Sequence, residues 1–367
     1  MKQGRRRSDQ FLLFAGKDGD HFAQAVADCL EMKLSPVKFL EFQGAIAGGG
    51  ETKPEVLCNV MDRTCVVVLS VYNTNFELWQ CGQLISALRS SGGAARIIAV
   101  LPCYPYARQD KSHGRREDIS ARFVADFFNM AGVYRVIYLD IHADQIEGFF
   151  KPAMVTSLWM DNIWVDYLTR HLPEVLLGLG LSEKFVRNMP LDEGAVYSNY
   201  RIAKILGTGL AVHLKKREIE KKHSVVSLGI AGDVVSCLVY ARDDILASGD
   251  SLFTAAEEAK KKGAKYVLAL VTHALAFDKE GQKPFAEKLN ESAVDELVVT
   301  NSLVHFADRV MNEPALQEKV TVLDVAPYVA SVLTRLNRGE TIREMMREVA
   351  PITLYRVLHV AEQARLR

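Results

Sequence analysis

The chain has 367 residues, of which 49% are hydrophobic and 25% charged, a balance typical of a globular protein with room for two domains. Lys and Arg together number 45, as do Asp and Glu, so the formal net charge of zero gives no indication of binding to nucleic acid or a membrane surface. The six cysteines form no Cys-x-x-Cys pair, and no stretch has the pattern of a signal peptide or the length of a transmembrane span. We therefore expect a cytoplasmic protein with free thiols.

Short apolar runs alternate with helical patterns along the first 150 residues. Strands are expected at 10–16, 65–70, 95–103 and 135–142, and helices at 20–32, 75–92 and 119–132. This alternation predicts a parallel sheet with helices on both faces.

The same alternation of predicted strands and helices begins again near residue 195. Helices are expected at 195–207 and 251–263, strands at 209–218, 234–241, 265–273 and 294–301, and a strand followed by a helix within 319–339. We predict an α/β protein with two similar domains, 1–155 and 156–340, and a helical C-terminal extension at 341–367.

The stretch "PYARQDKSHGRRED" (residues 105–118) follows a predicted strand and is rich in cations. Its charged and polar side chains include Arg108, Gln109, Asp110, Lys111, Arg115 and Arg116. Open α/β sheets bind ligands at the carboxyl ends of their strands, and Arg and Lys can offset the charge of a polyphosphate. A solvated charged loop is the alternative, and composition alone does not decide between them.

The stretch "LDIHADQIEGFF" (139–150) ends the next predicted strand. Asp140, His142 and Asp144 alternate there, so their side chains are expected on one face. An imidazole and a carboxylate could hold a metal bound to a nucleotide. The alternative is a purely structural histidine.

Two further stretches carry candidate chemistry. In "HLKKRE" (213–218), Lys215 and Arg217 share a face of an extended chain and could grip a phosphoryl group, although a hydrophilic hairpin is equally compatible. In "YARDDILASGDS" (240–251), Asp243 and Asp244 could accept hydrogen bonds from ribose hydroxyls. Ser248, Gly249 and Ser251 could offer hydroxyl and backbone N–H groups to a phosphate, just before a helix expected to begin at Leu252.

These stretches, with "DISARFVADFFNMAG" and "GAKYVLALVTHALA", resemble the ribose-phosphate pyrophosphokinases (phosphoribosyl pyrophosphate synthetases), in order, from residue 11 to 345. The resemblance implies two phosphoribosyltransferase-like domains and a homo-oligomer built from dimers, up to a hexamer. It also implies the reaction, which is transfer of the β,γ-diphosphoryl group of ATP to the 1-hydroxyl of ribose 5-phosphate with Mg²⁺.

The resemblance also assigns roles to individual residues. It implies ATP binding by Arg108, Gln109 and Asp110, contact with both magnesium and ATP by His142, catalysis by Lys215 and Arg217, ribose binding by Asp243 and Asp244, and phosphate binding by the loop Ser248, Gly249, Asp250 and Ser251. In "PLDEGA" (190–195) it implies a magnesium carboxylate at Asp192. Phe42 and Glu51, on either side of a glycine-rich insertion, match adenine-contacting residues, and the glutamate would contact the adenine in a neighbouring subunit.

The phosphate loop departs from the family pattern at three positions. Arg242 replaces an apolar strand residue, Ala247 an acid, and Asp250 a glycine. A carboxylate about 4 Å from a phosphate oxygen costs on the order of 4 kcal/mol at an effective dielectric of about 20. Either Arg242 offsets this charge, or Asp250 turns toward the start of the helix. The acceptor is therefore expected to be ribose 5-phosphate or a 5-substituted ribose phosphate.

Two other functions remain open at this point. The altered loop would suit a non-catalytic paralogue that assembles with an active synthetase. The acid pair alone would suit a phosphoribosyltransferase, but the stretches at 105–118 and 139–150 would then have no role. The intact cationic and histidine positions favour the enzyme.

Overall fold

The computed structural model describes residues 11–17, 19–42, 50–71, 74–112, 114, 116–191, 194–217, 225–278 and 280–342, with only the backbone at 215–217 and 225–228. The described chain forms two compact units, one from 11–158, 301–305 and 324–342, the other from 159–300 and 306–323. The domain limits inferred from the sequence stay a prediction. The expected C-terminal helix falls, from residue 343 onward, outside the described residues.

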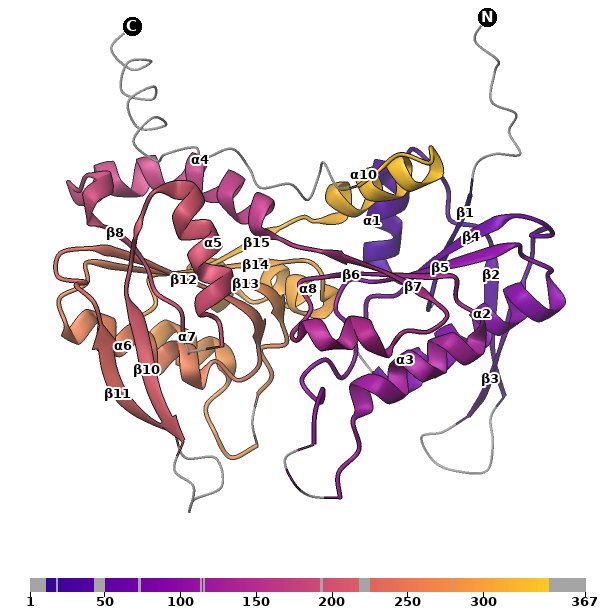
Figure 1. Cartoon of the computed structure of the whole chain (residues 1–367), viewed down its shortest axis with the longest axis horizontal. Helices are drawn as coiled ribbons and strands as arrows, with labels where there is room; N and C mark the ends of the chain where they lie inside the picture. Colours follow the sequence, from indigo (N-terminus) through magenta and orange to yellow (C-terminus); the bar gives the residue numbers. More distant parts are fainter. Residues whose placement is uncertain are drawn as a thin grey trace, which may run out of the picture. The chain divides into compact units, whose positions relative to one another are not determined.

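The first unit is built on a five-stranded parallel sheet in the order β1-β4-β5-β6-β7. Its strands are β1 (Leu12–Ala15), β4 (Thr64–Val68), β5 (Arg96–Leu101), β6 (Arg135–Leu139) and β7 (Met154–Leu158). Helices α1 (His21–Cys29) and α10 (Ala326–Asn337) cover one face, and α2 (Thr74–Ser86) and α3 (Ser120–Ala131) the other (Figure 1). The strands are apolar runs because both faces of the sheet are covered. An antiparallel hairpin, β2 (Val37–Phe42) and β3 (Glu51–Val56), completes the unit.

The second unit contains a six-stranded parallel sheet in the order β15-β14-β13-β12-β8-β9. Its strands are β8 (Val186–Asn188), β9 (Gly209–Leu210), β12 (Leu238–Leu246), β13 (Tyr266–Ala274), β14 (Glu296–Thr300) and β15 (Val320–Leu323). Helices α4 (Asp161–Leu179) and α5 (Val196–Leu206) lie on one face, and α6 (Asp250–Lys261) and α7 (Phe285–Glu291) on the other (Figure 1). Two short helices, α8 (Val304–Asn312) and α9 (Pro314–Gln317), connect β14 to β15.

Alternate residues of the central strands build the core of the second unit. Val239 and Ala241 of β12, and Val267, Ala269 and Val271 of β13, pack in one buried cluster with α6. The period of two puts their neighbours on the opposite face of the sheet. A separate antiparallel ribbon, β10 (Val212–Arg217) and β11 (Val225–Ala231), extends from this unit.

Parallel strands bring their carboxyl ends to one edge of each sheet. In the first unit the loops after β5 and β6 leave that edge, and in the second unit the loops after β12 and β13 do so. The loops after β5, β6 and β12 hold Arg108, Gln109, Asp110, His142, Ser248 and Gly249 among the residues that the sequence identified. None of the helices in the described ranges combines the length and apolarity needed to span a bilayer.

Candidate active site

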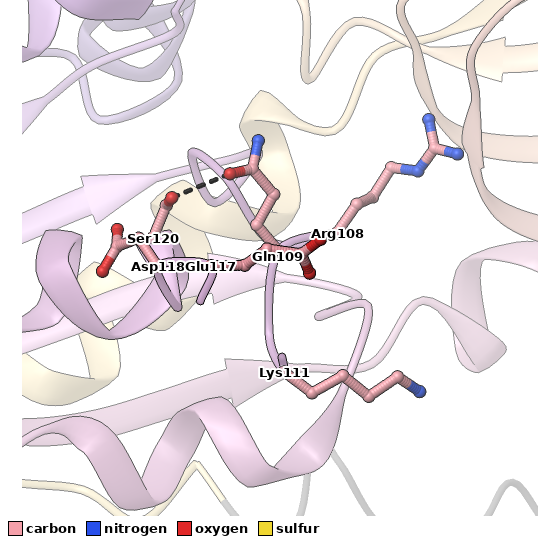
Figure 2. A pocket seen from close by; sticks show the side chains of 6 residues that line it. All are labelled: Arg108, Gln109, Lys111, Glu117, Asp118 and Ser120. Carbon is pink, nitrogen blue, oxygen red and sulfur yellow. Dashed lines mark hydrogen bonds between the residues drawn. The ribbon is translucent and has the colours of Figure 1, made fainter. Parts of the chain in front are cut away.

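The loop after β5 forms an open pocket in the first unit. Its volume is about 360 Å³, and it is lined by Arg108, Gln109, Lys111, Glu117, Asp118 and Ser120. Oε1 of Gln109 accepts a hydrogen bond of 2.7 Å from Oγ of Ser120, the first residue of α3, and this fixes the loop to the helix. Figure 2 shows the exposed side chains of Arg108 and Lys111 extending away from that hydrogen bond. Their cationic ends suit a polyphosphate.

Asp110 joins this loop to the loop that follows β6. Its side chain is buried, and Oδ2 accepts a hydrogen bond from Nε2 of Gln145. Strands β5 and β6 are hydrogen-bonded neighbours, so both loops start from the same edge of the sheet. Asp110 therefore holds together the two segments predicted to bind the nucleotide.

The prediction that Asp140, His142 and Asp144 share one face at the end of an extended strand is wrong. Strand β6 ends at Leu139, and Asp140 is buried with a φ of +36°, which breaks the extended conformation. His142 and Asp144 are exposed, and Asp144 begins the 3₁₀ helix η3 (Asp144–Phe149). In that helix, burial and the charge of Asp144 raise the pKa of Glu147 above its usual range.

The candidate metal residues at this edge are few. Among the residues that the structure describes, no three His, Cys, Asp or Glu side chains gather closely enough to hold a metal by themselves. Mg²⁺ usually keeps several waters and takes few protein ligands beside the phosphates. The exposed His142 fits such a role, whereas Asp192 lies outside the described residues.

The hairpin β2–β3 brings Phe42 and Glu51 together. The two residues are direct cross-strand partners. Eight residues lie between them in the sequence, and seven of these, 43–49, are outside the described residues. Phe42 is 51% exposed and Glu51 is also exposed. An exposed ring beside an exposed carboxylate can stack on and hydrogen-bond a base.

Lys215 and Arg217 lie in β10, two residues apart. In the antiparallel ribbon Lys215 pairs with Ser227 and Arg217 with Val225, and the register shifts by one residue between Leu214 and Lys215. A shift of this kind is a β-bulge, a feature that re-aims the strand. The period of two places both basic residues on one face of the ribbon.

The acid pair Asp243 and Asp244 lies inside β12, not after it. The strand continues to Leu246, and α6 begins at Asp250, two residues before the expected Leu252. Both acids are half-buried, and Oδ1 of Asp243 accepts the backbone N–H of Asp244 at 3.0 Å. The pair is thus held at the carboxyl edge by the strand itself.

Asn199 on α5 holds the edge of β12 beside the acid pair. Strand β8 pairs with β12 only as far as Tyr240. Beyond that point, Nδ2 of the fully buried Asn199 donates to the carbonyl of Arg242 at 2.8 Å, and its Oδ1 accepts the Arg242 N–H at 3.0 Å. The asparagine therefore continues the ladder where the strand has ended.

The turn from Ser248 to Asp250 requires a glycine at only one position. Gly249 has a φ of +81°, and a Cβ there would lie 2.6 Å from the ring of Phe253. Asp250 is the first residue of α6 and has helical backbone. Asp250, where the resemblance implies a glycine, is therefore compatible with the backbone of the turn.

Asp250 has an ion pair that the sequence did not indicate. Nζ of Lys288, on α7, lies 3.2 Å from Oδ1 of Asp250 and donates to the carbonyl of Ser248 at 3.1 Å. Oδ2 of Asp250 accepts a hydrogen bond of 2.8 Å from Oγ of Ser248. The carboxylate also lies in the first turn of α6, where the helix dipole stabilises it.

Comparison with known proteins decides the family. Residues 11–132 match the model of the N-terminal domain of ribose phosphate pyrophosphokinase, and residues 209–347 match the phosphoribosyl synthetase-associated domain. The chain is 32% identical to ribose-phosphate pyrophosphokinase of Corynebacterium efficiens over 328 residues, which cover 89% of this chain and 92% of that protein. The chain belongs to the ribose-phosphate pyrophosphokinase family.

Further similar proteins support this family assignment. Ribose-phosphate pyrophosphokinase A of Dictyostelium discoideum is 29% identical, over 92% of this chain and 98% of its own length. The crystal structure of phosphoribosylpyrophosphate synthetase from Mycobacterium smegmatis superposes with a TM-score of 0.76 at 30% identity, over 90% of this chain and 99% of the other. The predicted fold class and enzyme class are confirmed, and the chain is a transferase of phosphoribosyl pyrophosphate synthesis.

Three residues that contact the candidate site were missed by sequence reasoning. Gln145 and Asn199 act through hydrogen bonds to Asp110 and Arg242, and Lys288 acts from a helix 38 residues away from Asp250. The buried position of Asn199 inside an amphipathic helix was a usable signal, because a buried amide needs a partner. The sequence contains no local signal for Gln145 or Lys288.

Proposed function

We propose that this enzyme transfers the β,γ-diphosphoryl group of Mg-ATP to the 1-hydroxyl of ribose 5-phosphate and releases AMP. The observation that carries the proposal is that each sheet presents a complementary set of groups at its carboxyl edge. The first unit presents a pocket whose lining includes two exposed cations, Arg108 and Lys111, and the second presents an acid pair followed by a glycine turn at a helix start.

On the nucleotide side, Arg108 and Lys111 are exposed cations that would bind the phosphates. Gln109 and Asp110 are fixed by Ser120 and Gln145, so they would orient the nucleotide without rearrangement. Phe42 and Glu51 would contact the adenine bound to a neighbouring subunit, and this requires a homo-oligomer built from dimers.

On the acceptor side, Asp243 and Asp244 would accept hydrogen bonds from the two ribose hydroxyls. The N–H groups at the start of α6, with the hydroxyls of Ser248 and Ser251, would face the 5-phosphate. This arrangement leaves the 1-hydroxyl as the nucleophile of the reaction.

Lys215 and Arg217 would stabilise the negative charge on the transferring group. Groups that meet developing charge in this way account for much of phosphoryl-transfer catalysis. When bound, Mg²⁺ supplies charge neutralisation on the ATP phosphates, and His142 and Asp192 are the residues that would hold it. We place the reaction in the cytoplasm, because all six cysteines are free thiols.

A 5-substituted ribose phosphate is the second candidate acceptor. Asp250 favours it, since an esterified phosphate carries less negative charge than a phosphate monoester and is repelled less by a carboxylate. Relative kcat/KM values for ribose 5-phosphate and its methyl phosphodiester decide between the two acceptors.

The catalytic assignment is tested by three alanine variants of strand β10. Lys215→Ala and Arg217→Ala are expected to lower kcat for AMP release by about a hundredfold or more each. Lys216→Ala is the control, because the period of two places it on the opposite face of the same ribbon. Equal loss in all three variants contradicts the assignment. Absence of AMP release by the wild type with any ribosyl acceptor would indicate the non-catalytic paralogue instead.

A further inference from the structure

Lys288 is positioned by the core of the second unit and reaches the phosphate turn from outside it. Its side chain is only 15% exposed, and its Nζ bonds both the carbonyl of Ser248 and Oδ1 of Asp250. Phe285, about one helical turn before it in α7, and Leu289, the residue after it, are fully buried. The ammonium group is therefore held at the turn by the packing of α7.

The packing of α7 against α6 fixes the distance between the side chains of Lys288 and Asp250. The ring of Phe285 lies 5.8 Å from that of Phe253 on α6, and the backbone N–H of Phe285 donates to Asp278 at 2.6 Å. Asp250 is the first residue of the same helix α6. Both charged groups are thus attached to elements that pack directly against each other.

Both oxygens of the Asp250 carboxylate are engaged, one by Lys288 and the other by the hydroxyl of Ser248. A phosphate monoester carries about −1.5 to −2 charges at neutral pH. Such a group at the turn meets a carboxylate whose charge is balanced by an ammonium group 3.2 Å away. The repulsion expected from Asp250 alone is then largely cancelled, because the two charges act on the phosphate from almost the same place.

We propose that Lys288 determines acceptor specificity by neutralising Asp250, so that the turn accepts a ribose carrying a 5-phosphate monoester. The inference rests on the proposed function for the identity of the acceptor. It assigns Lys288 no contact with the reacting atoms. Lys288 is a specificity-determining residue that acts through Asp250.

A double-mutant cycle in the full-length protein tests this coupling. The dissociation constant of ribose 5-phosphate is measured by calorimetry for wild type, Lys288→Met, Asp250→Asn and the double variant. We expect Lys288→Met to weaken ribose 5-phosphate binding by about ten- to a hundredfold. Because Asp250 is half-exposed, solvent screening keeps this loss below the full Coulomb repulsion between its carboxylate and the phosphate. In the Asp250→Asn background the same change should weaken binding by less than about threefold.

Two control variants separate charge from folding. Lys288→Arg keeps the charge and should bind ribose 5-phosphate within about threefold of wild type. Lys283→Met removes a cation near α7 that pairs with Glu287 and Glu291 at the surface, and it should leave binding unchanged. The KM for ATP should be the same in all variants that release AMP.

Equal weakening by Lys288→Met in both backgrounds overturns the proposal, since the effect would not depend on Asp250. Unchanged binding in Lys288→Met also overturns it, as does tighter binding of the methyl phosphodiester than of the monoester by the wild type. Calorimetry measures binding and does not depend on turnover. If the double-mutant cycle shows the expected coupling between Lys288 and Asp250, but the wild type releases no AMP, that result would contradict only the proposed function.

Discussion

The side-chain amide of Asn199 bonds both backbone groups of Arg242, donating to its carbonyl at 2.8 Å and accepting its N–H at 3.0 Å. The next residue in β12 is Asp243, the first of the two acids proposed to bind ribose. A helix thus sets the position of the strand segment that carries the proposed acceptor site, at a point where β8 no longer pairs with it. The same oxygen of Asn199 also accepts from Nδ2 of Asn188 at 3.0 Å.

Replacement of Asn199 by alanine should destabilise the enzyme and weaken acceptor binding. The buried N–H and carbonyl of Arg242 lose these bonds, and the free energy of unfolding should fall by about 1–3 kcal/mol in urea denaturation. The KM for the ribosyl acceptor should rise while the KM for ATP stays constant. Asn312→Ala is the control, because Asn312 makes a similar bond to the Asp308 carbonyl on an exposed helix face. Equal changes in both KM values would contradict this account.

Replacement of Gln145 by leucine should act on the nucleotide side. It removes the hydrogen bond to the buried Asp110, and hydrogen bonds to charged groups contribute about 1.5–3 kcal/mol. We expect the KM for ATP to rise about ten- to a hundredfold, with little change in the KM for the acceptor. Gln24→Leu offers a matched control, since Gln24 makes the same kind of bond to Asp28 on an exposed helix face. An unchanged KM for ATP in Gln145→Leu would show that the two loops are positioned without this bond.

Gly249 and Gly281 allow steric collision to be separated from backbone strain. Their φ values are +81° and +74°, so alanine costs about 1–2 kcal/mol of strain at either position. Only at Gly249 does the added Cβ approach another side chain, the ring of Phe253 at 2.6 Å; at Gly281 nothing lies within 4 Å. Gly249→Ala should therefore raise the acceptor KM by more than about tenfold, and Gly281→Ala should leave it unchanged. The measurement is a comparison of KM values, with unfolding curves for both variants.

The order of elements was predictable because apolar periodicity is a local property. The runs at 65–70 and 95–103 became β4 and β5, and the expected parallel sheets formed in both halves. The hairpin β2–β3 and helix α4 were not predicted. The hairpin is partly exposed and has no apolar alternation, and α4 contains Pro173 within its helical pattern.

The site was predictable where one segment carries the chemistry and unpredictable where two segments meet. Arg108, in the loop after β5, and Asp243, near the carboxyl end of β12, were each identified within their own segment, at the expected edge of each sheet. The ion pair of Lys288 with Asp250 depends on the packing of α7 against α6, which no local pattern specifies. The turn at Asp140 was missed for a similar reason, because a positive φ at a non-glycine residue is imposed by the surrounding structure.

Glu296 should make the stability of the second unit depend on pH. Burial favours its neutral form, but hydrogen bonds from His171 at 2.7 Å, Tyr167 at 2.8 Å and Tyr266 at 3.1 Å hold the pKa of Glu296 below its ordinary value. A carboxyl with a lowered pKa stabilises the folded state above its ordinary pKa, and that stabilisation is lost as the pH falls through the folded value.

Urea denaturation across a pH series checks this. Below a pH of about 4.5 the wild type should lose stability more steeply than Glu296→Gln, which should be less stable than wild type at neutral pH. Glu291→Gln serves as the control, since Glu291 pairs with Lys283 at the surface and should contribute little. Parallel pH profiles for wild type and Glu296→Gln would contradict the assignment.

The identity of the transferred group is the most direct test of the proposed function. Purified enzyme is incubated with Mg-ATP and ribose 5-phosphate, and the phosphorus NMR spectrum is followed over time. The account predicts that AMP and a ribose 1-diphosphate 5-phosphate accumulate in equal amounts as ATP disappears. Accumulation of ADP with a singly phosphorylated product, or consumption of ATP that does not depend on the ribosyl acceptor, would contradict it.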